Sequence, residues 1–115
     1  MQITLNKWYR HTQTNKGKLV KLLECVSVVD NYYVFTALAQ TGEVYEVSEE
    51  YLTEIKSWRP GDWVNVGGNI IQLMQEVAVS EPWNRVFCIH EGNPNNCDCP
   101  DPEVIKPAEC NDIKQ

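Results

Sequence analysis

Residues 59–68 read RPGDWVNVGG, and this stretch decides the fold because two turn signals flank a short run of alternating side chains. Pro60-Gly61 suits the central positions of a type II turn, since proline presets φ at the first and glycine accepts a positive φ at the second. Gly67-Gly68 suits the two-residue loop of a β-hairpin. The stretch therefore predicts a strand over residues 63–66 that turns back at the glycine pair.

The two strands that meet at the glycine pair have one apolar face. Folding the chain there places Val64 opposite Ile71 and Trp63 opposite Gln72. A period of two residues then brings one set of aliphatic side chains onto a single face, whereas the other face is mixed. This pattern is typical of a sheet that is covered on one side. The aliphatic set consists of Val64, Ile71, Leu73, Val77 and Val79.

Two further strand signals precede this hairpin. Residues 3–9 predict a first short strand. Residues 19–29 are rich in valine and leucine, and they predict a long, bent strand that contacts the core on both sides of a kink. Asp30-Asn31 tolerates positive φ and predicts a turn into a strand over residues 32–39.

A second hairpin and a short helix complete the first half of the chain. Thr41-Gly42 predicts a turn that places Leu38 opposite Tyr45 and Thr36 opposite Val47. Ser48 is a good helix N-cap, and acidic residues follow it where the helix dipole favours negative charge. We expect a helix of one or two turns there, and a last strand over residues 83–90.

Length and composition indicate a single globular domain. The chain has 115 residues, of which 43% are hydrophobic and 23% charged, values near the globular average. No apolar run approaches the ~18 residues that a membrane span requires. The first residues lack the charged-then-apolar plan of a signal peptide, so we expect synthesis in the cytoplasm.

The net charge of −6 is unevenly distributed and makes nucleic acid an unlikely partner class. Up to residue 23 every charged residue is basic, which keeps a phosphate-binding surface as the alternative to a solvated face. From Glu91 onward acidic residues outnumber basic ones.

Residues 19–55, with their turn, hairpin and short helix leading into Pro60-Gly61, resemble a small SH3-like barrel. The resemblance covers residues 19–79 and implies a fold only. We expect a mainly β protein: a small SH3-like barrel of five to six antiparallel strands with one short helix over residues 1–92. Four of the six prolines fall in residues 94–107, so residues 93–115 are expected to form an extended C-terminal arm. No internal repeat is evident.

The cysteines leave three possibilities open. Two disulfides could pair Cys88 or Cys97 with Cys99 or Cys110 and fix the arm. A zinc site is the alternative, because soft thiolates and imidazole are its preferred ligands, although only one residue separates the paired cysteines. Free thiols are the third possibility. The candidate zinc ligands are Cys88, His90, Cys97, Cys99 and Cys110.

No catalytic motif is present, and we expect neither an enzyme nor a bound cofactor. The two histidines lie outside any nucleophile–base arrangement, and the glycine pair is explained by the hairpin. Aromatic residues are more numerous than a core of this size should bury, and exposed aromatic side chains are typical of protein-binding surfaces. The candidate partner-binding residues are Trp8, Tyr9, Tyr32, Tyr33 and Trp83.

The sequence therefore favours a non-enzymatic protein-interaction or structural module, oligomeric in its context and without a membrane partner. Within that class we expect a phage virion accessory protein, such as a capsid decoration or connector protein, whose C-terminal arm contacts neighbouring subunits. A cytosolic zinc-binding regulatory adaptor and a small inhibitor protein are the alternatives.

Overall fold

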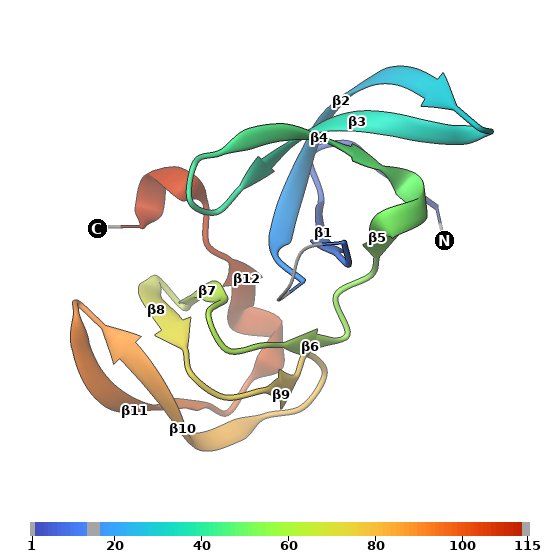
Figure 1. Cartoon of the computed structure of the whole chain (residues 1–115). Coiled ribbons are helices and arrows are strands. Elements are labelled where there is room, and N and C mark those ends of the chain that lie inside the picture. The colour runs from blue at the N-terminus through green and yellow to red at the C-terminus, as the bar shows by residue number, and fades with distance from the viewer. Residues whose placement is uncertain (1, 14–16, 114–115) are drawn as a thin grey trace. The chain divides into compact units, whose positions relative to one another are not determined.

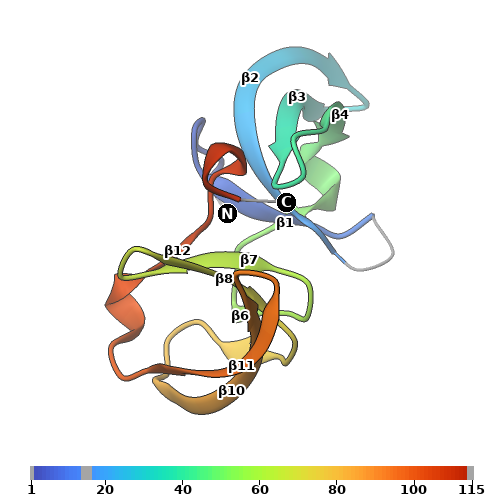
Figure 2. The ribbon, with the colours of Figure 1, turned by 90° about the vertical axis from the view of Figure 1, so that its left-hand side faces the viewer.

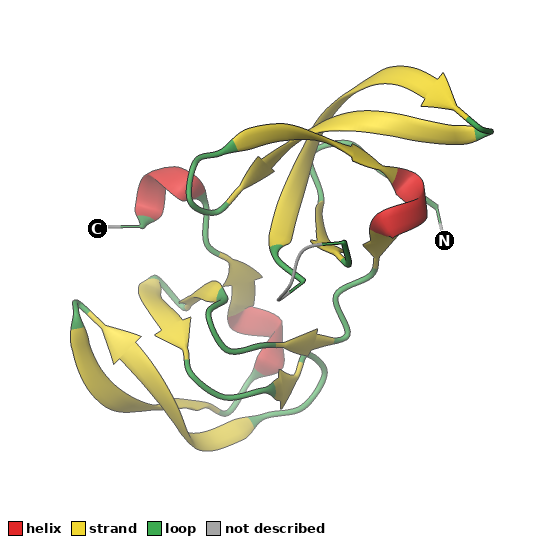
Figure 3. Cartoon of the chain, in the orientation of Figure 1, coloured by secondary structure: helices red, strands yellow, loops and turns green. Residues whose placement is uncertain are grey.

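A computed structural model describes residues 2–13 and 17–113 of the chain (Figure 1). The described residues are mainly β-strand in antiparallel sheets, and every helix among them is a three-residue 3-10 turn (Figure 3). The chain divides into two compact units, Met1–Ile55 and Lys56–Gln115, which we call unit 1 and unit 2. This division differs from the expected boundary at residue 92.

Unit 1 holds a five-stranded sheet in the order β4-β3-β2-β1-β5. Its core gathers Tyr9, Val20, Leu22, Phe35, Ala37, Val47 and Leu52. The first strand begins later than expected, at Trp8, and the other predicted elements are present. The elements are β1 (Trp8–His11), β2 (Leu19–Val29), β3 (Tyr32–Ala39), β4 (Val44–Ser48), the 3-10 turn η1 (Glu49–Tyr51) and β5 (Leu52–Thr53).

The register of the β3–β4 hairpin corrects the prediction by one residue. Ala37, not Leu38, lies opposite Tyr45, and Phe35, not Thr36, lies opposite Val47. The Ala39 N–H donates to the Glu43 carbonyl, and Gly42 has a φ of 96°. The loop is thus longer than the two-residue turn expected at Thr41-Gly42, and a slip of one residue reverses which side chains face the core.

Unit 2 contains the predicted hairpin at Gly67-Gly68. Trp63 lies opposite Gln72 and Val64 opposite Ile71, as predicted. Gly67 and Gly68 have φ values of 59° and 102°, which confirms why glycine is needed at this turn. The elements are β6 (Ser57–Trp58), β7 (Trp63–Val66), β8 (Asn69–Leu73), β9 (Val77–Ala78), β10 (Trp83–His90), β11 (Asn93–Cys99), η2 (Pro102–Val104), β12 (Ile105–Pro107) and η3 (Cys110–Asp112).

Much of the expected C-terminal arm is part of this sheet. β11 pairs with β10, and β12 pairs with β7, giving the order β11-β10-β8-β7-β12. Cys99 and Ala108 are fully buried. Pro94 and Pro107 sit in the two edge strands of the sheet, positions where a missing N–H is tolerated. Proline content therefore indicated edge strands here, and the expectation of an extended arm is corrected.

The two units share one topology. In each, the first four sheet strands follow one another in antiparallel order, a 3-10 turn comes next, and the fifth strand returns to pair with the first. The turns are even capped alike. Ser48 accepts from the Glu50 N–H before η1, and Asp101 accepts from the Glu103 N–H before η2. The chain is thus a structural repeat, which the sequence analysis did not detect.

The strand registers define which residues correspond. Leu52 and Ile105 each follow a 3-10 turn and pair with the first strand of their sheet, opposite His11 and Val66. Carrying the pairing across each sheet equates Trp8 with Trp63, Tyr9 with Val64, Val20 with Ile71, Leu22 with Leu73, Phe35 with Val86 and Ala37 with Cys88. Most of these are core positions in both units. No closed barrel is found among the described residues of either unit.

Candidate interaction site

The feature of unit 1 without a counterpart in unit 2 is the outer half of the β2–β3 hairpin, residues 23–34, which we call the projecting hairpin. Figure 1 shows β2 and β3 running out together past the end of β4, and Figure 2 shows the strong bend of β2. The bend coincides with two register shifts, between Leu22 and Glu24 and between Cys25 and Ser27. Such β-bulges bend and twist a strand. They confirm the predicted kink, but only the first half of β2 contacts the core.

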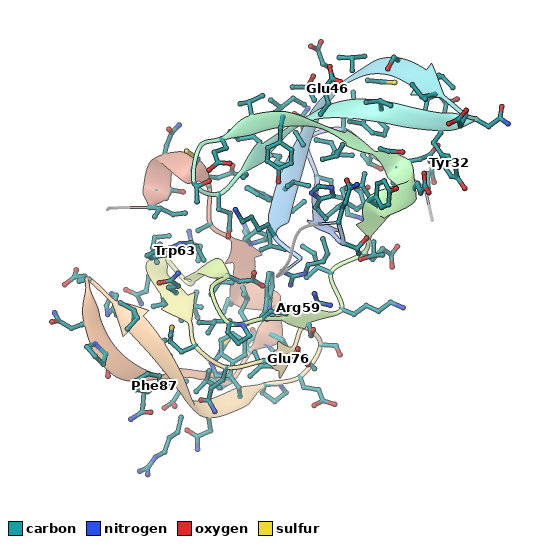
Figure 4. The ribbon with its side chains drawn as sticks, in the orientation of Figure 1. Tyr32, Glu46, Arg59, Trp63, Glu76 and Phe87 are labelled. Atoms are coloured by element: carbon teal, nitrogen blue, oxygen red, sulfur yellow. A yellow bond between two sulfur atoms is a disulfide. The ribbon has the colours of Figure 1, made fainter. Side chains whose placement is uncertain are left out.

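The tip of the projecting hairpin is a two-residue turn. Asp30 and Asn31 have φ values of 52° and 70°, as the sequence predicted. Asn and Asp tolerate this region better than other residues with a side chain. Tyr32 lies at this free end (Figure 4).

The projecting hairpin exposes a run of apolar side chains. Val28 is 60% exposed and Val29 55%, whereas Leu22, just before the first bulge, is fully buried. Exposed apolar patches of this kind mark interaction surfaces. The exposed apolar residues of the hairpin are Leu23, Val26, Val28, Val29, Tyr32 and Tyr33.

Both faces of the hairpin are apolar. Opposed residues in an antiparallel pair share a face, and successive residues alternate between faces. Val28 lies opposite Tyr33, on the face that Phe35 uses to enter the core. Val29 lies opposite Tyr32 on the other face. The core face of the sheet therefore continues into solvent, and the reverse side is also apolar near the tip, at Val29 and Tyr32.

Tyr33, close to the tip of the projecting hairpin, makes one contact with η1 and one with Phe35 of its own strand. The Tyr33 N–H donates to Glu49 Oε1 at 2.8 Å. The Tyr33 and Phe35 rings lie 6.4 Å apart, within the range of a favourable aromatic pair. The projecting hairpin is thus tied to unit 1 at Glu49 and at Phe35, of which Phe35 belongs to the core.

The charged side chains within the projecting hairpin are all acidic. Glu24 and Asp30 are its ionisable carboxylates, and from Leu22 to Ile55 the sequence contains no lysine or arginine. Lys7 and Lys21 lie at the base of the hairpin, beside Leu22. A partner of the hairpin would therefore meet apolar side chains with negative charge toward the tip and positive charge at the base.

Of the candidate partner-binding residues, only the two adjacent tyrosines are accessible. Tyr32 is 41% exposed and Tyr33 is 53% exposed. Tyr9 is completely buried in the core of unit 1, and Trp8 and Trp83 are buried as well. The valines of the hairpin were not among the predicted site residues because the whole of residues 19–29 was expected to contact the core. The absence of acid or base between Cys25 and Val29 was the available signal.

The cysteines do not form the arrangement of either detailed hypothesis. Cys88 and Cys97 form a disulfide, with their Cα atoms 6.3 Å apart, while Cys99 is a buried thiol and Cys110 a half-buried one. Burial raises the pKa of the Cys99 thiol. Within residues 2–13 and 17–113, no group of three or more histidine, cysteine or acidic side chains is placed to hold a metal ion. Cys25 is an exposed thiol rather than the expected core residue.

A shallow hollow in unit 2 is a weaker candidate. It is lined by Pro82, Trp83, Asn84, Asp98 and Pro100. Asp98, its carboxylate, accepts a hydrogen bond from the Arg85 N–H at 2.7 Å. Since Arg85 has a φ of 58° and lies at a register shift within β10, this bond braces a strained position of the strand. The carboxylate is thereby explained without a ligand.

No protein-family model, curated protein or solved structure matches the chain. Among the described residues, no helix has the length and apolar character needed to cross a membrane.

Proposed function

We propose that this chain is a non-enzymatic protein-interaction module and that the projecting hairpin is its docking element. The observation that carries the proposal is the run of exposed apolar side chains on both faces of a hairpin whose base, at Leu22 and Phe35, is part of the core. Full burial of an aliphatic or aromatic side chain contributes about 1.5–3 kcal/mol. Burial of several such side chains against a partner would therefore be strongly favourable.

The second unit supports this proposal. Its segment at the equivalent position, residues 74–85, folds back so that β9 pairs with β6. Trp58 of β6 is 3% exposed, and Val77 and Ala78 are half-buried. The same topology is thus completed without a projecting hairpin, so the projection in unit 1 is not a requirement of the fold.

Within this class, a structural or accessory role in a large assembly such as a phage virion remains our preferred context. Small size fits that role, and so does a disulfide, because disulfides persist once a protein leaves a reducing compartment. Because β11 and β12 are part of the sheet of unit 2, we assign the contact with neighbouring subunits to the projecting hairpin and not to the C-terminal residues.

At the level of fold, we propose that each unit is a small SH3-like domain. The features behind the resemblance were consecutive hairpins and a short helix in residues 19–55. Unit 1 has that order of elements, and unit 2 repeats it. An experimental structure of either unit would test this assignment through the closure of its sheet.

The two alternative functions have less support. The disulfide occupies two of the five candidate zinc ligands. An inhibitor or ligand-binding role would depend on a pocket, and the hollow beside Trp83 is shallow with its carboxylate already engaged.

Site-specific photo-crosslinking tests the proposed function. A benzophenone amino acid at Tyr33 should give covalent adducts with a protein in the native host, because this side chain lies within the docking element. The same label at Val44, which is 58% exposed in β4, is the matched control and should give none. Absence of any adduct at Tyr33, or equal labelling from both positions, would refute the interaction role.

A further inference from the structure

We infer that the occupant of the projecting hairpin is the same hairpin of a second copy, lying antiparallel along the open edge of β2 about a two-fold axis. This inference rests on the proposed interaction role and names the partner. Three observations carry it: an open strand edge, a charge gradient that complements itself, and the apolar character of the side chains at that edge.

β1 covers the edge of β2 only as far as Leu22. The Leu22 N–H donates to the Lys7 carbonyl, and the Leu22 carbonyl accepts from the Asn6 N–H. Beyond that point, no described residue pairs with this edge of β2, whereas β3 pairs with the other edge up to Val29. A partner strand could therefore continue the line of β1.

The open edge lacks the charges that normally protect a strand edge. Between Leu23 and Val29 the only ionisable carboxylate is Glu24. Edge strands are usually shielded by charged side chains or proline because they otherwise pair with another chain. The outer strand β4 shows the contrast, since Glu46 lies within it and Glu43 just before it. The bulges in β2 limit regular main-chain pairing, so side-chain packing supplies most of the contact.

Charge selects the antiparallel arrangement with a second copy. Lys7 and Lys21 lie at the base of the hairpin, next to Leu22, and Asp30 lies at its tip. Two hairpins side by side and antiparallel bring each acidic tip to the basic base of the other, whereas parallel hairpins bring like charges together. Placing Asp30 opposite Lys21 of the other copy puts the two-fold axis between Cys25 and Val26. The contact is isologous, the commonest form of homodimer interface.

Edge substitutions measure the association. Sedimentation of the full chain across micromolar concentrations should report a dimer, and Val28→Lys should make it monomeric. Val44→Lys is the matched control, because Val44 is 58% exposed and Val28 60%. Circular dichroism checks that both variants fold. A wild-type chain that stays monomeric, or two variants with the same effect, would overturn the inference.

A charge exchange tests the antiparallel register. Asp30→Lys alone and Lys21→Glu alone should each weaken the dimer roughly tenfold, because each creates two like-charge contacts. Mixing the two variants should restore association, since in the mixed dimer both contacts join opposite charges. A mixture that associates no better than its components would contradict this register.

Oxidation provides a covalent readout that uses the natural residue. Cys25 lies beside the axis, so mild oxidation should give a disulfide-linked dimer that is lost in Cys25→Ser and kept in Cys110→Ser. If neither dimer nor crosslink forms, while the benzophenone at residue 33 captures a different protein, the second-copy inference fails and the interaction role stands. If it captures nothing, both fail.

Discussion

The segment joining the second and third sheet strands has the same length in both units, residues 23–34 in unit 1 and residues 74–85 in unit 2, yet it follows two different paths. In unit 1 it is a bulged hairpin that projects beyond the sheet. In unit 2 it returns, and β9 pairs with β6 over the buried Trp58. Chain length and position are therefore not what determines the path.

Local composition explains the difference. Asp30 and Asn31 accept the positive φ values of a tight turn, and the β-branched residues before them favour strand. The equivalent residues of unit 2 include Ser80, Glu81 and Pro82, and proline cannot donate to a strand ladder. Unit 2 instead fixes its segment by the short β6–β9 pairing and by the hydrogen bond from the Val79 N–H to the Lys56 carbonyl. In unit 2 the segment packs back at Val77 and Ala78, whereas in unit 1 it leaves Val28 and Val29 exposed.

Truncating a matched core leucine in each unit should have the largest effect. Leu22 and Leu73 correspond in register, and both are completely buried. Leu→Ala at either position should lower the free energy of unfolding by about 2–5 kcal/mol, because a cavity is left behind. Urea denaturation measures the loss, and amide hydrogen exchange assigns it to the unit that carries the substitution.

Val28→Ala is the control for the core variants. Its side chain lies outside the core, so under monomeric conditions the change in unfolding free energy should stay within about 0.5 kcal/mol. A loss as large as that of Leu22→Ala would mean that the projecting hairpin is packed within its own chain, contrary to the comparison of the two units.

Removing the disulfide should have the next largest effect, confined to unit 2. Cys88 corresponds to Ala37, and Cys97 corresponds to Val47, since each lies opposite an equivalent residue of the third strand. The double substitution Cys88→Ala, Cys97→Val therefore gives unit 2 the side chains of unit 1. The linked residues are nine apart, so loss of the crosslink should lower stability by about 2–3 kcal/mol. Hydrogen exchange under non-reducing conditions should show the loss in unit 2 and none in unit 1.

The sequence predicted local structure better than relationships between distant segments. Turn residues located Asp30-Asn31 and Gly67-Gly68, and Ser48 located η1, because each effect acts within a few residues. The register of the β3–β4 hairpin was wrong by one residue, since Thr41-Gly42 does not reveal how many residues its loop contains. The pairing of β11 and β12 depends on contacts that no short pattern encodes.

The repeat and the exposure of the projecting hairpin were missed for a related reason. Equivalent positions share burial but not residue type, as Tyr9 and Val64 or Ala37 and Cys88 show. Burial constrains size and polarity rather than identity, so two copies of a fold can lack a visible repeat. Likewise, a run of valines predicts a strand equally well whether its own chain or a partner covers it. Only the position of the bulges shows where β2 leaves the core.

The smallest predicted effect concerns pH and a position where the units differ chemically. His11 corresponds to Val66. Burial lowers the pKa of His11 below its usual value of 6.5, and its ring lies 5.7 Å from that of Tyr45. The unfolded chain therefore binds more protons than the folded chain below about pH 6.5. The free energy of unfolding should then decrease as the pH is lowered through that window, by at most about 1.4 kcal/mol per pH unit. His11→Val should abolish this part of the slope, measured by urea denaturation between pH 7 and pH 5 (roughly the range in which histidine titrates).

His90, which is half-buried in unit 2, is the matched control. If His90→Val flattens the slope and His11→Val does not, burial at the end of β1 is not its cause.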